Sequence, residues 1–344
     1  MIRAMAGMRH GRRLAWTAAL SLCLTPFDSV TAPVHEARPL MGTVVEVMVE
    51  PADATAGSEK RLHAAIDAAY REMQRLSDMM NHYDPNSVVS ALNDAAGVRA
   101  VRAPPELMAV LAMAQAMSER SQGAFDVTVA SVRGWRFRAD DPRMPSAADV
   151  VAQLPRVGWK KLRLDARAQT AFLAARGMGV DLGGIAKLYI VHAGMQVLQR
   201  RGIVRAMVNG GGDVEVVGGD GARPWRVGVR DPRAPQRLLG VLDVVRGFVV
   251  TSGDYERAFV RDGRRYHHIL DPRTGYPAEG PRGVTLVGER LEDVNGLGVA
   301  IMVRGKAAGV RWLTENPRIE GLIVDADGIL WMTPGLRARM RALP

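Results

Sequence analysis

A series of short β-prone runs, separated by glycine-containing turns, constrains the fold of this chain more than any other feature. These runs fall at residues 206–208, 214–217, 225–229, 238–245, 248–250, 255–261, 264–270, 283–288, 321–324 and 328–332. Asp-Gly pairs at residues 262–263 and 327–328 join neighbouring runs, and Asp-Gly between β-prone segments is a strong hairpin signal. The second half of the chain is therefore predicted to form a mixed or antiparallel sheet.

The first half of the chain has the apolar spacing of helices. Residues 59–80 place apolar side chains three and four positions apart, directly after a β-prone run at 43–49. Further helices are predicted at 104–117, which begins with proline, and at 187–201, which Gly202 ends. Because 47% of residues are apolar and no repeat or long linker is present, we expect one α+β domain over residues 33–344.

The first 32 residues have the form of a signal peptide. The Arg12-Arg13 pair precedes the apolar run 14–24, which is too short to span a bilayer comfortably. We therefore expect residues 1–32 to be removed from an exported, periplasmic protein. The arginine pair leaves the export route, Sec or Tat, open. Cys23, the only cysteine, makes a lipid anchor the alternative to a cleaved soluble protein.

The positive charge of the chain suits an anionic ligand. The formal net charge is +10, but the sequence contains no basic stripe with interleaved aromatic residues. This pattern does not favour nucleic-acid binding.

Two glycine clusters are candidate anion-binding turns. Gly210-Gly211-Gly212 follows a β-prone run, and glycine there lets backbone amides approach a phosphate. Gly183-Gly184 precedes a predicted helix, whose free amides would hold an anion. The first cluster is not a dinucleotide fingerprint, because it runs into a β-prone segment rather than a helix. Tight turns alone are the alternative explanation.

Asp181 and Lys187 flank the second cluster. Asp181 has the position to accept a hydrogen bond from an adenine or ribose donor. The alternative is a helix cap for Asp181 and a solvated side chain for Lys187.

The segment 251–277 carries the most specific chemistry. His268 lies among arginines and is followed by Asp271 and Arg273 in a Pro-Arg-Thr-Gly turn. A histidine between a basic face and an aspartate can act as a general base near neutral pH. The alternative is a structural histidine on a strand.

An ordered series of motifs resembles the ApbE family, the FAD:protein FMN transferases. The resemblance extends from Met41 to about Trp331. In chain order its motifs are MGT (41–43), NHYDPNSVVSALN (81–93), GAFDVTV (123–129), VDLGGIAK (180–187), VNGGGD (208–213), WRVGVRDPR (225–233), TSGDYERAF (251–259) and HHILDPRTGYP (267–277).

The resemblance implies both a fold and a reaction. The fold is a single T-fold-like α+β domain with a glycine-rich FAD cleft. The reaction uses FAD with Mg²⁺, transfers FMN to a threonine hydroxyl of an exported redox protein, which can be associated with the membrane, and releases AMP. Such metal-assisted phosphoryl transfer depends mainly on positioning and on neutralisation of charge.

The resemblance also assigns roles to particular residues of this sequence. His268 is the candidate base, Met41 and Tyr83 are expected to pack on flavin or adenine, and Asp271 and Arg273 are expected to shape the turn. The candidate cofactor-binding residues are Met41, Tyr83, Ala124, Phe125, Asp126, Asp181, Gly183, Gly184, Lys187, Gly211, Gly212, Asp213, Ser252, Gly253, Asp254, Asp271 and Arg273.

The sequence departs from the family pattern at the metal ligands. Together with Gly184, the family uses an aspartate and, four residues later, a threonine, and these positions hold Asn295 and Val299 here. Valine offers no oxygen and asparagine only a neutral one, whereas Mg²⁺ prefers charged oxygen ligands. We therefore expect a weakened or lost metal site, with Asp293, or more remotely Glu292, as the substitute.

Two further departures lie after Lys187. Leu188 replaces a glycine, which would narrow the nucleotide side of the cleft, and His192 replaces an aspartate. Three functions remain open: an active exported flavin transferase, an FAD-binding accessory protein for the maturation of respiratory enzymes, and an FAD pyrophosphatase.

Overall fold

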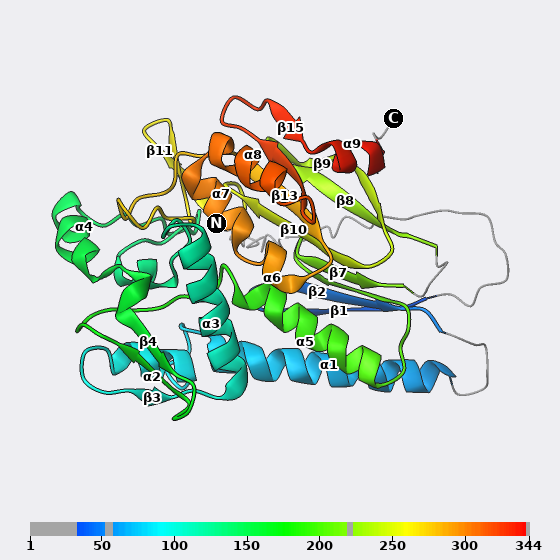
Figure 1. Cartoon of the computed structure of the whole chain (residues 1–344), viewed down its shortest axis with the longest axis horizontal. Helices are drawn as coiled ribbons and strands as arrows, with labels where there is room; N and C mark the ends of the chain where they lie inside the picture. The colour runs from blue at the N-terminus through cyan, green and yellow to red at the C-terminus, as the bar shows by residue number, and fades with distance from the viewer. Residues whose placement is uncertain (1–32, 52–57, 219–222, 342–344) are drawn as a thin grey trace, which may run out of the picture. The chain divides into compact units, whose positions relative to one another are not determined.

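The computed structural model describes residues 33–51, 58–218 and 223–341 (Figure 1). The expected signal peptide at 1–32, with Arg12, Arg13 and Cys23, lies outside these residues. Within the described ranges, every helix is too short or too polar to cross a membrane.

An antiparallel eight-stranded sheet forms the centre of the fold. Its strands, in spatial order, are β1 (Val34–Leu40), β2 (Thr43–Val49), β6 (Ala206–Gly210), β7 (Val214–Val217), β10 (Gly247–Gly253), β13 (Gly283–Gly288), β14 (Glu320–Val324) and β15 (Leu330–Met332). The α+β class and the antiparallel sheet predicted from the sequence are therefore confirmed.

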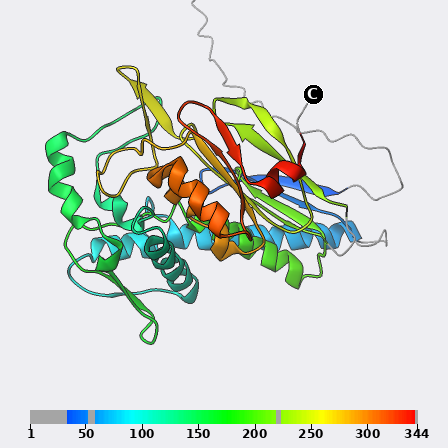
Figure 2. The ribbon, with the colours of Figure 1, turned by 45° about the horizontal axis from the view of Figure 1, so that its top comes forward.

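Helices cover one face of this sheet. The long helices α1 (Ser58–Met80) and α5 (Ala186–Arg200) run side by side (Figure 1, Figure 2). Gly194 permits this close approach, because a Cβ added there would lie 2.7 Å from Sδ of Met73. The shorter helices α6 (Leu291–Val294), α7 (Leu297–Arg304) and α8 (Lys306–Glu315) follow β13. The apolar residues of these helices and of one sheet face form the larger hydrophobic core.

A small second sheet covers the other face. It consists of β8 (Trp225–Asp231), β9 (Ala234–Val244) and β16 (Met340–Arg341), and α9 (Pro334–Arg339) precedes its last strand. Alternation along β10 sends Phe248 into the larger core and Val249 into the smaller one. The central strand is thus packed on both faces.

The remaining elements form two peripheral groups. The first contains α2 (Val88–Asp94), α3 (Pro105–Arg120), α4 (Ala147–Gln153), the three-stranded sheet of β3 (Val101–Arg102), β5 (Thr170–Leu173) and β4 (Leu162–Asp165), and the 3₁₀ turns η1 (Val127–Ser131), η2 (Leu154–Arg156) and η3 (Trp159–Lys161). The second is the hairpin of β11 (Ala258–Arg261) and β12 (Arg264–His267).

The hairpin confirms the Asp-Gly signal, although its strands are shorter than predicted. Asp262 and Gly263 both have positive φ, 51° and 74°, as a two-residue type I′ turn requires. The hairpin forms a sheet of its own, and Figure 2 shows it (yellow) standing apart from the central sheet. Phe259 and Tyr266 stack across it with ring centroids 5.3 Å apart, and Trp135 lies 6.0 Å from Tyr266. Aromatic packing therefore holds the hairpin on its neighbours.

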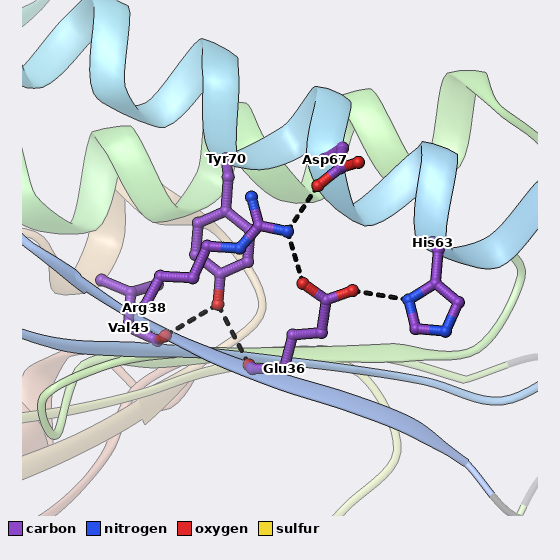
Figure 3. Close-up of polar contacts among 6 residues, drawn as sticks. All are labelled: Glu36, Arg38, Val45, His63, Asp67 and Tyr70. Carbon is purple, nitrogen blue, oxygen red and sulfur yellow. Dashed lines mark hydrogen bonds and ion pairs between the residues drawn. The ribbon is translucent and has the colours of Figure 1, made fainter.

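A polar network fastens the edge strand β1 to α1. Figure 3 shows its members, Glu36, Arg38, Val45, His63, Asp67 and Tyr70. Glu36 Oε1 lies 2.7 Å from His63 Nδ1, and Arg38 bridges Glu36 and Asp67. The Tyr70 hydroxyl lies 2.7 Å from the carbonyl oxygen of Val45 and 3.0 Å from that of Glu36. The network therefore joins one face of α1 to both strands of the first hairpin.

This network predicts a pH-dependent contribution to stability. The hydrogen bond to Glu36 raises the pKa of His63, so protonated His63 stabilises the fold. The contribution is fully present below the unfolded pKa of about 6.5 and is lost as pH rises through the higher folded pKa. We expect His63→Gln to lower the thermal midpoint at about pH 6 and to leave it unchanged at about pH 9. Thermal unfolding of both proteins across this range tests the sign, and a difference that grows with pH would contradict it.

Candidate functional site

Residues from separate motifs meet at the loop before α5. Nδ1 of His82 lies 3.3 Å from Oδ1 of Asp181, which also accepts a 2.8 Å hydrogen bond from the Gly183 amide. Burial acts to raise the pKa of Asp181, but its contacts with His82 and Gly183 and the charge of Arg257 hold it below its ordinary value. The Asp181 carboxylate is therefore an ionised hydrogen-bond acceptor within this loop.

His268 directly follows β12 beside Arg257. Its backbone amide donates to the Arg257 carbonyl at 3.1 Å, and its buried Nδ1 has no hydrogen-bond partner within the described residues. Burial, together with the nearby charge of Arg257, lowers the pKa of His268 to about 3. The imidazole is consequently neutral near pH 7 and has a nitrogen available to accept a proton. The carboxylate that acts on its pKa is that of Asp181.

Sequence reasoning did not single out His82 or Arg257. Both lie inside the motifs quoted above, but an exposed arginine in a connection between two strands looks, in sequence, like any solvated surface residue. Only the fold brings Arg257 close enough to affect both Asp181 and His268.

The turn 271–277 is closed by its own residues. Asp271 accepts hydrogen bonds from the backbone amide of Arg273 at 2.9 Å and from its guanidinium at 2.7 Å. The Gly275 amide donates to the Asp271 carbonyl at 2.8 Å. The ion pair and hydrogen bonds between Asp271 and Arg273 thus hold the turn that follows His268.

The glycine turns are linked to each other and to the first hairpin. Lys187 Nζ lies 2.7 Å from the buried carboxylate of Asp213, which rules out the solvated alternative for Lys187. A Cβ at Gly211 would lie 2.3 Å from Oγ1 of Thr43, directly after the Met41-Gly42 turn. Met41 adopts a positive φ of 54° and packs on the larger core.

Several amides in these turns are already hydrogen-bonded. Gly183 donates to Asp181, Gly212 donates to the Asn209 side chain at 2.9 Å, and Gly210 donates to the Asp213 carbonyl at 2.8 Å. The expectation that these turns present free amides to an anion is therefore wrong for Gly183, Gly210 and Gly212. The bonds fix the shape of the turns instead.

The GAFD segment (residues 123–126) is largely buried and packs against the Gly184 loop. Ala124 and Phe125 are buried, and a Cβ at Gly184 would lie 3.2 Å from the Phe125 ring. Asp126 is buried, which raises its pKa, and its carboxylate accepts bonds from the amides of Thr128 and Trp159, each at 2.8 Å. Both carboxylate oxygens of Asp126 are therefore already hydrogen-bonded within the protein.

The TSGD segment ends β10 at the site. Ser252 faces α7, because a Cβ on Gly298 would lie 2.6 Å from its hydroxyl oxygen. After the buried Gly253, the Asp254 carboxylate pairs with Arg282 at 2.9 Å. Ser252 therefore lies beside the helix that carries position 299.

Tyr83 differs from these packed residues. Its side chain is 75% exposed, and its ring centroid lies 3.8 Å from that of His82. The two rings are tilted by 39° to each other, so the exposed Tyr83 ring is the accessible aromatic surface next to His82, which contacts Asp181.

The family metal positions do meet in space, but their groups do not suit Mg²⁺. Asn295 donates a 2.9 Å bond to the Ile185 carbonyl, and a methyl of Val299 lies 3.6 Å from the Cβ position of Gly184. Among the described residues there is no group of three or more His, Cys, Asp or Glu side chains able to hold a metal. A neutral amide and a hydrocarbon do not supply the charged oxygens that Mg²⁺ prefers.

The acids expected to replace the metal ligands form ion pairs elsewhere, and the two residues that differ from the family after Lys187 also have other contacts. The Asp293 carboxylate lies 3.4 Å from Arg318, and Glu292 lies 3.8 Å from Arg290. Leu188 is buried in the larger core, whereas His192 bonds the buried Glu215 at 2.9 Å. None of these acids joins a metal cluster within the described ranges.

Comparison with known proteins gives a consistent result. The model of the ApbE family matches residues 41–323. An FAD:protein FMN transferase from Treponema pallidum (strain Nichols) is 32% identical over 299 residues, which cover 82% of this chain and 83% of that protein. One from Klebsiella pneumoniae (strain 342) is 30% identical over 283 residues, covering 81% and 88%.

Solved structures agree. The crystal structure of the ApbE protein from Thermotoga maritima has a TM-score of 0.78 and 31% identity, and covers 90% of this chain and 99% of that one. The flavin transferase ApbE from Vibrio cholerae has a TM-score of 0.76 and 26% identity, and covers 89% and 99%. The chain belongs to the ApbE family.

Proposed function

We propose that this chain is an FAD:protein FMN transferase that attaches FMN to a hydroxyl of an acceptor protein and releases AMP. Relatives that match over more than four fifths of both chains are named for this activity. The observation that carries the proposal is the unpartnered, buried Nδ1 of neutral His268, which lies near ionised Asp181 and cationic Arg257.

The residues present suit the proton transfer that this reaction needs. The acceptor hydroxyl oxygen forms a bond to the phosphorus on the FMN side of the pyrophosphate, and the bond from that phosphorus to the bridging oxygen breaks. The electron pair leaves with AMP, and the hydroxyl proton passes to Nδ1 of His268. Burial keeps His268 neutral near pH 7, so one of its ring nitrogens carries a lone pair.

We further propose that the acceptor is an exported protein flavinylated on threonine. The signal-peptide pattern of residues 1–32 supports export to the periplasm, either as a soluble protein or with a lipid on Cys23. An exported transferase acts on targets in the same compartment, such as membrane-associated redox proteins. The resemblance supports threonine as the modified residue.

Asn295 and Val299 favour a second candidate function. Without the charged metal ligands, the same fold would serve as an FAD-binding accessory protein in respiratory enzyme maturation. An FAD pyrophosphatase, the third alternative, would release FMN and AMP without an acceptor.

The test is to express the full chain in a bacterium that lacks its own flavin transferase. Periplasmic and membrane proteins are separated under denaturing conditions, examined for flavin fluorescence, and digested for mass spectrometry of FMN-threonine peptides. We expect at least one labelled protein, which is absent without this chain and whose threonine-to-alanine variant is not labelled. Release of FMN and AMP without labelling would identify a pyrophosphatase, and FAD binding with neither product would identify an accessory protein.

A further inference from the structure

The position of the family aspartate is built around an amide in this chain. Asn295 is 2% exposed, and its Nδ2 donates to the Ile185 carbonyl at 2.9 Å and approaches Met113 Sδ at 3.2 Å. An aspartate here would direct a carboxylate oxygen at a carbonyl oxygen and a thioether, neither of which donates a hydrogen bond. The surroundings are therefore complementary to asparagine and not to an ionised aspartate.

The position of the family threonine is apolar. Val299 packs against the larger core, and its methyl group faces Gly184 in the loop that follows Asp181. A valine side chain contributes no ligand oxygen. The two substitutions therefore remove one charged and one hydroxyl ligand from the same small volume.

Nearby acids do not replace these ligands. Asp293 pairs with Arg318, whereas Asp181 is already held by His82 and the Gly183 amide. Mg²⁺ binds through charged oxygens in a near-octahedral shell, which these side chains do not offer.

Arg257 supplies a fixed positive charge close to the same loop. It is exposed and hydrogen-bonds the Tyr83 side chain, and within the described part of the chain no carboxylate forms an ion pair with its guanidinium. Lys187, by contrast, is paired with Asp213. A guanidinium binds phosphate oxygens through two parallel hydrogen bonds and retains its charge in a protein.

We infer that this chain handles the pyrophosphate of FAD without a protein-held divalent cation, with Arg257 neutralising charge that the metal neutralises elsewhere in the family. The inference rests on the proposed function for the identity of the nucleotide. It makes Arg257 a phosphate-binding residue, and it makes Asn295 and Val299 the cause of metal independence.

The first test is titration of the chain from residue 33 onward with FAD, followed by flavin fluorescence, in MgCl₂ and in EDTA. The expected dissociation constants agree within about threefold. Arg257→Gln should weaken binding about tenfold or more in both buffers, which corresponds to the loss of one charge-assisted phosphate contact. Arg261→Gln, an exposed arginine at the far end of β11, is the control and should leave the dissociation constant unchanged.

The second test restores the family ligands. The double variant Asn295→Asp/Val299→Thr should bind FAD more tightly in MgCl₂ than in EDTA, whereas Val299→Thr alone should behave as the parent. Binding of Mn²⁺ alone, followed by electron paramagnetic resonance, provides a readout that does not depend on FAD or on activity. Thermal unfolding shows whether the double variant folds. If it does not fold, the FAD and Mn²⁺ titrations of the parent protein test the inference without it.

The outcomes separate the inference from the proposed function. Parent protein that binds FAD only with Mg²⁺, or that binds Mn²⁺ stoichiometrically, overturns the inference and leaves the transferase proposal intact. An Arg257→Gln variant with unchanged FAD affinity overturns the role of Arg257. A parent that binds no FAD in either buffer overturns the proposed function, and the inference with it.

Discussion

Replacing His268 by alanine is expected to lower the rate of FMN transfer by about 10²–10⁴-fold, the contribution typical of a positioned general base. The side chain follows the hairpin strand β12, and its Nδ1 has no partner within the described residues, so its removal breaks no side-chain hydrogen bond seen there. The dissociation constant for FAD should therefore change by less than about threefold. Single-turnover transfer to the labelled acceptor and FAD titration give the two quantities.

The adjacent histidine is the natural control for this variant. His267 is buried, with Nε2 2.9 Å from the Ala278 carbonyl oxygen, and its Nδ1 accepts from the Ile269 amide at 3.3 Å. His267→Ala should cost about 1–3 kcal/mol of unfolding free energy because it leaves buried partners unsatisfied. The folded fraction should still transfer FMN. Transfer at the parental rate by His268→Ala would eliminate the general-base role.

Replacing Gly211 by alanine is expected to destabilise the fold by about 2–4 kcal/mol and to abolish tight FAD binding. Gly211 has a φ of 69°, which is unfavourable for alanine, and the new Cβ would lie 2.3 Å from Oγ1 of Thr43. Relief of this clash requires the glycine turn and the strand after the Met41-Gly42 turn to separate. Urea unfolding gives the stability change, and flavin fluorescence gives the loss of binding.

The neighbouring Gly212 separates backbone strain from the clash. Its φ is 102°, but a Cβ there would have open space within 4 Å. Gly212→Ala should therefore cost only the backbone term, about 1–2 kcal/mol. Thr43→Gly should recover part of the stability lost in Gly211→Ala. Equal destabilisation by the two alanine variants would show that contact with Thr43 is unimportant.

The three longest helices and the strands of the second half could be predicted because each follows from local sequence. The helix predicted at 59–80 is α1, and the Asp-Gly pair at 262–263 does close a hairpin. Strand β1 could not be predicted, because its half-buried positions include the charged Glu36 and Arg38 and it has no apolar run. Its stability comes from β2 and from the Glu36 network, neither of which is visible in its own sequence.

The motifs indicated where the site would form but not how its groups are paired. The family resemblance grouped residues 295 and 299 with Gly184, and the structure brings them to the Gly184 loop. The partner of Asp181 is a histidine about a hundred positions earlier in the chain, and two of three glycine amides at 210–212 bond within their own turn. Such pairings depend on tertiary packing, which periodicity and motif spacing do not encode.

The separate sheet of β11 and β12 divides the site into two units of different local stability. Ser252 lies near the end of β10, which pairs with β13 along its length and with β7 over residues 247–249, and whose side chains lie in both cores. We therefore expect this half to open only with the whole domain. Arg257 and His268 flank a two-stranded ribbon that is held by aromatic contacts. We expect partial opening of the ribbon to displace Arg257 and His268 while the loop that holds Asp181 stays folded. In the proposed transferase, entry of an acceptor protein would then require only the free energy of that local opening.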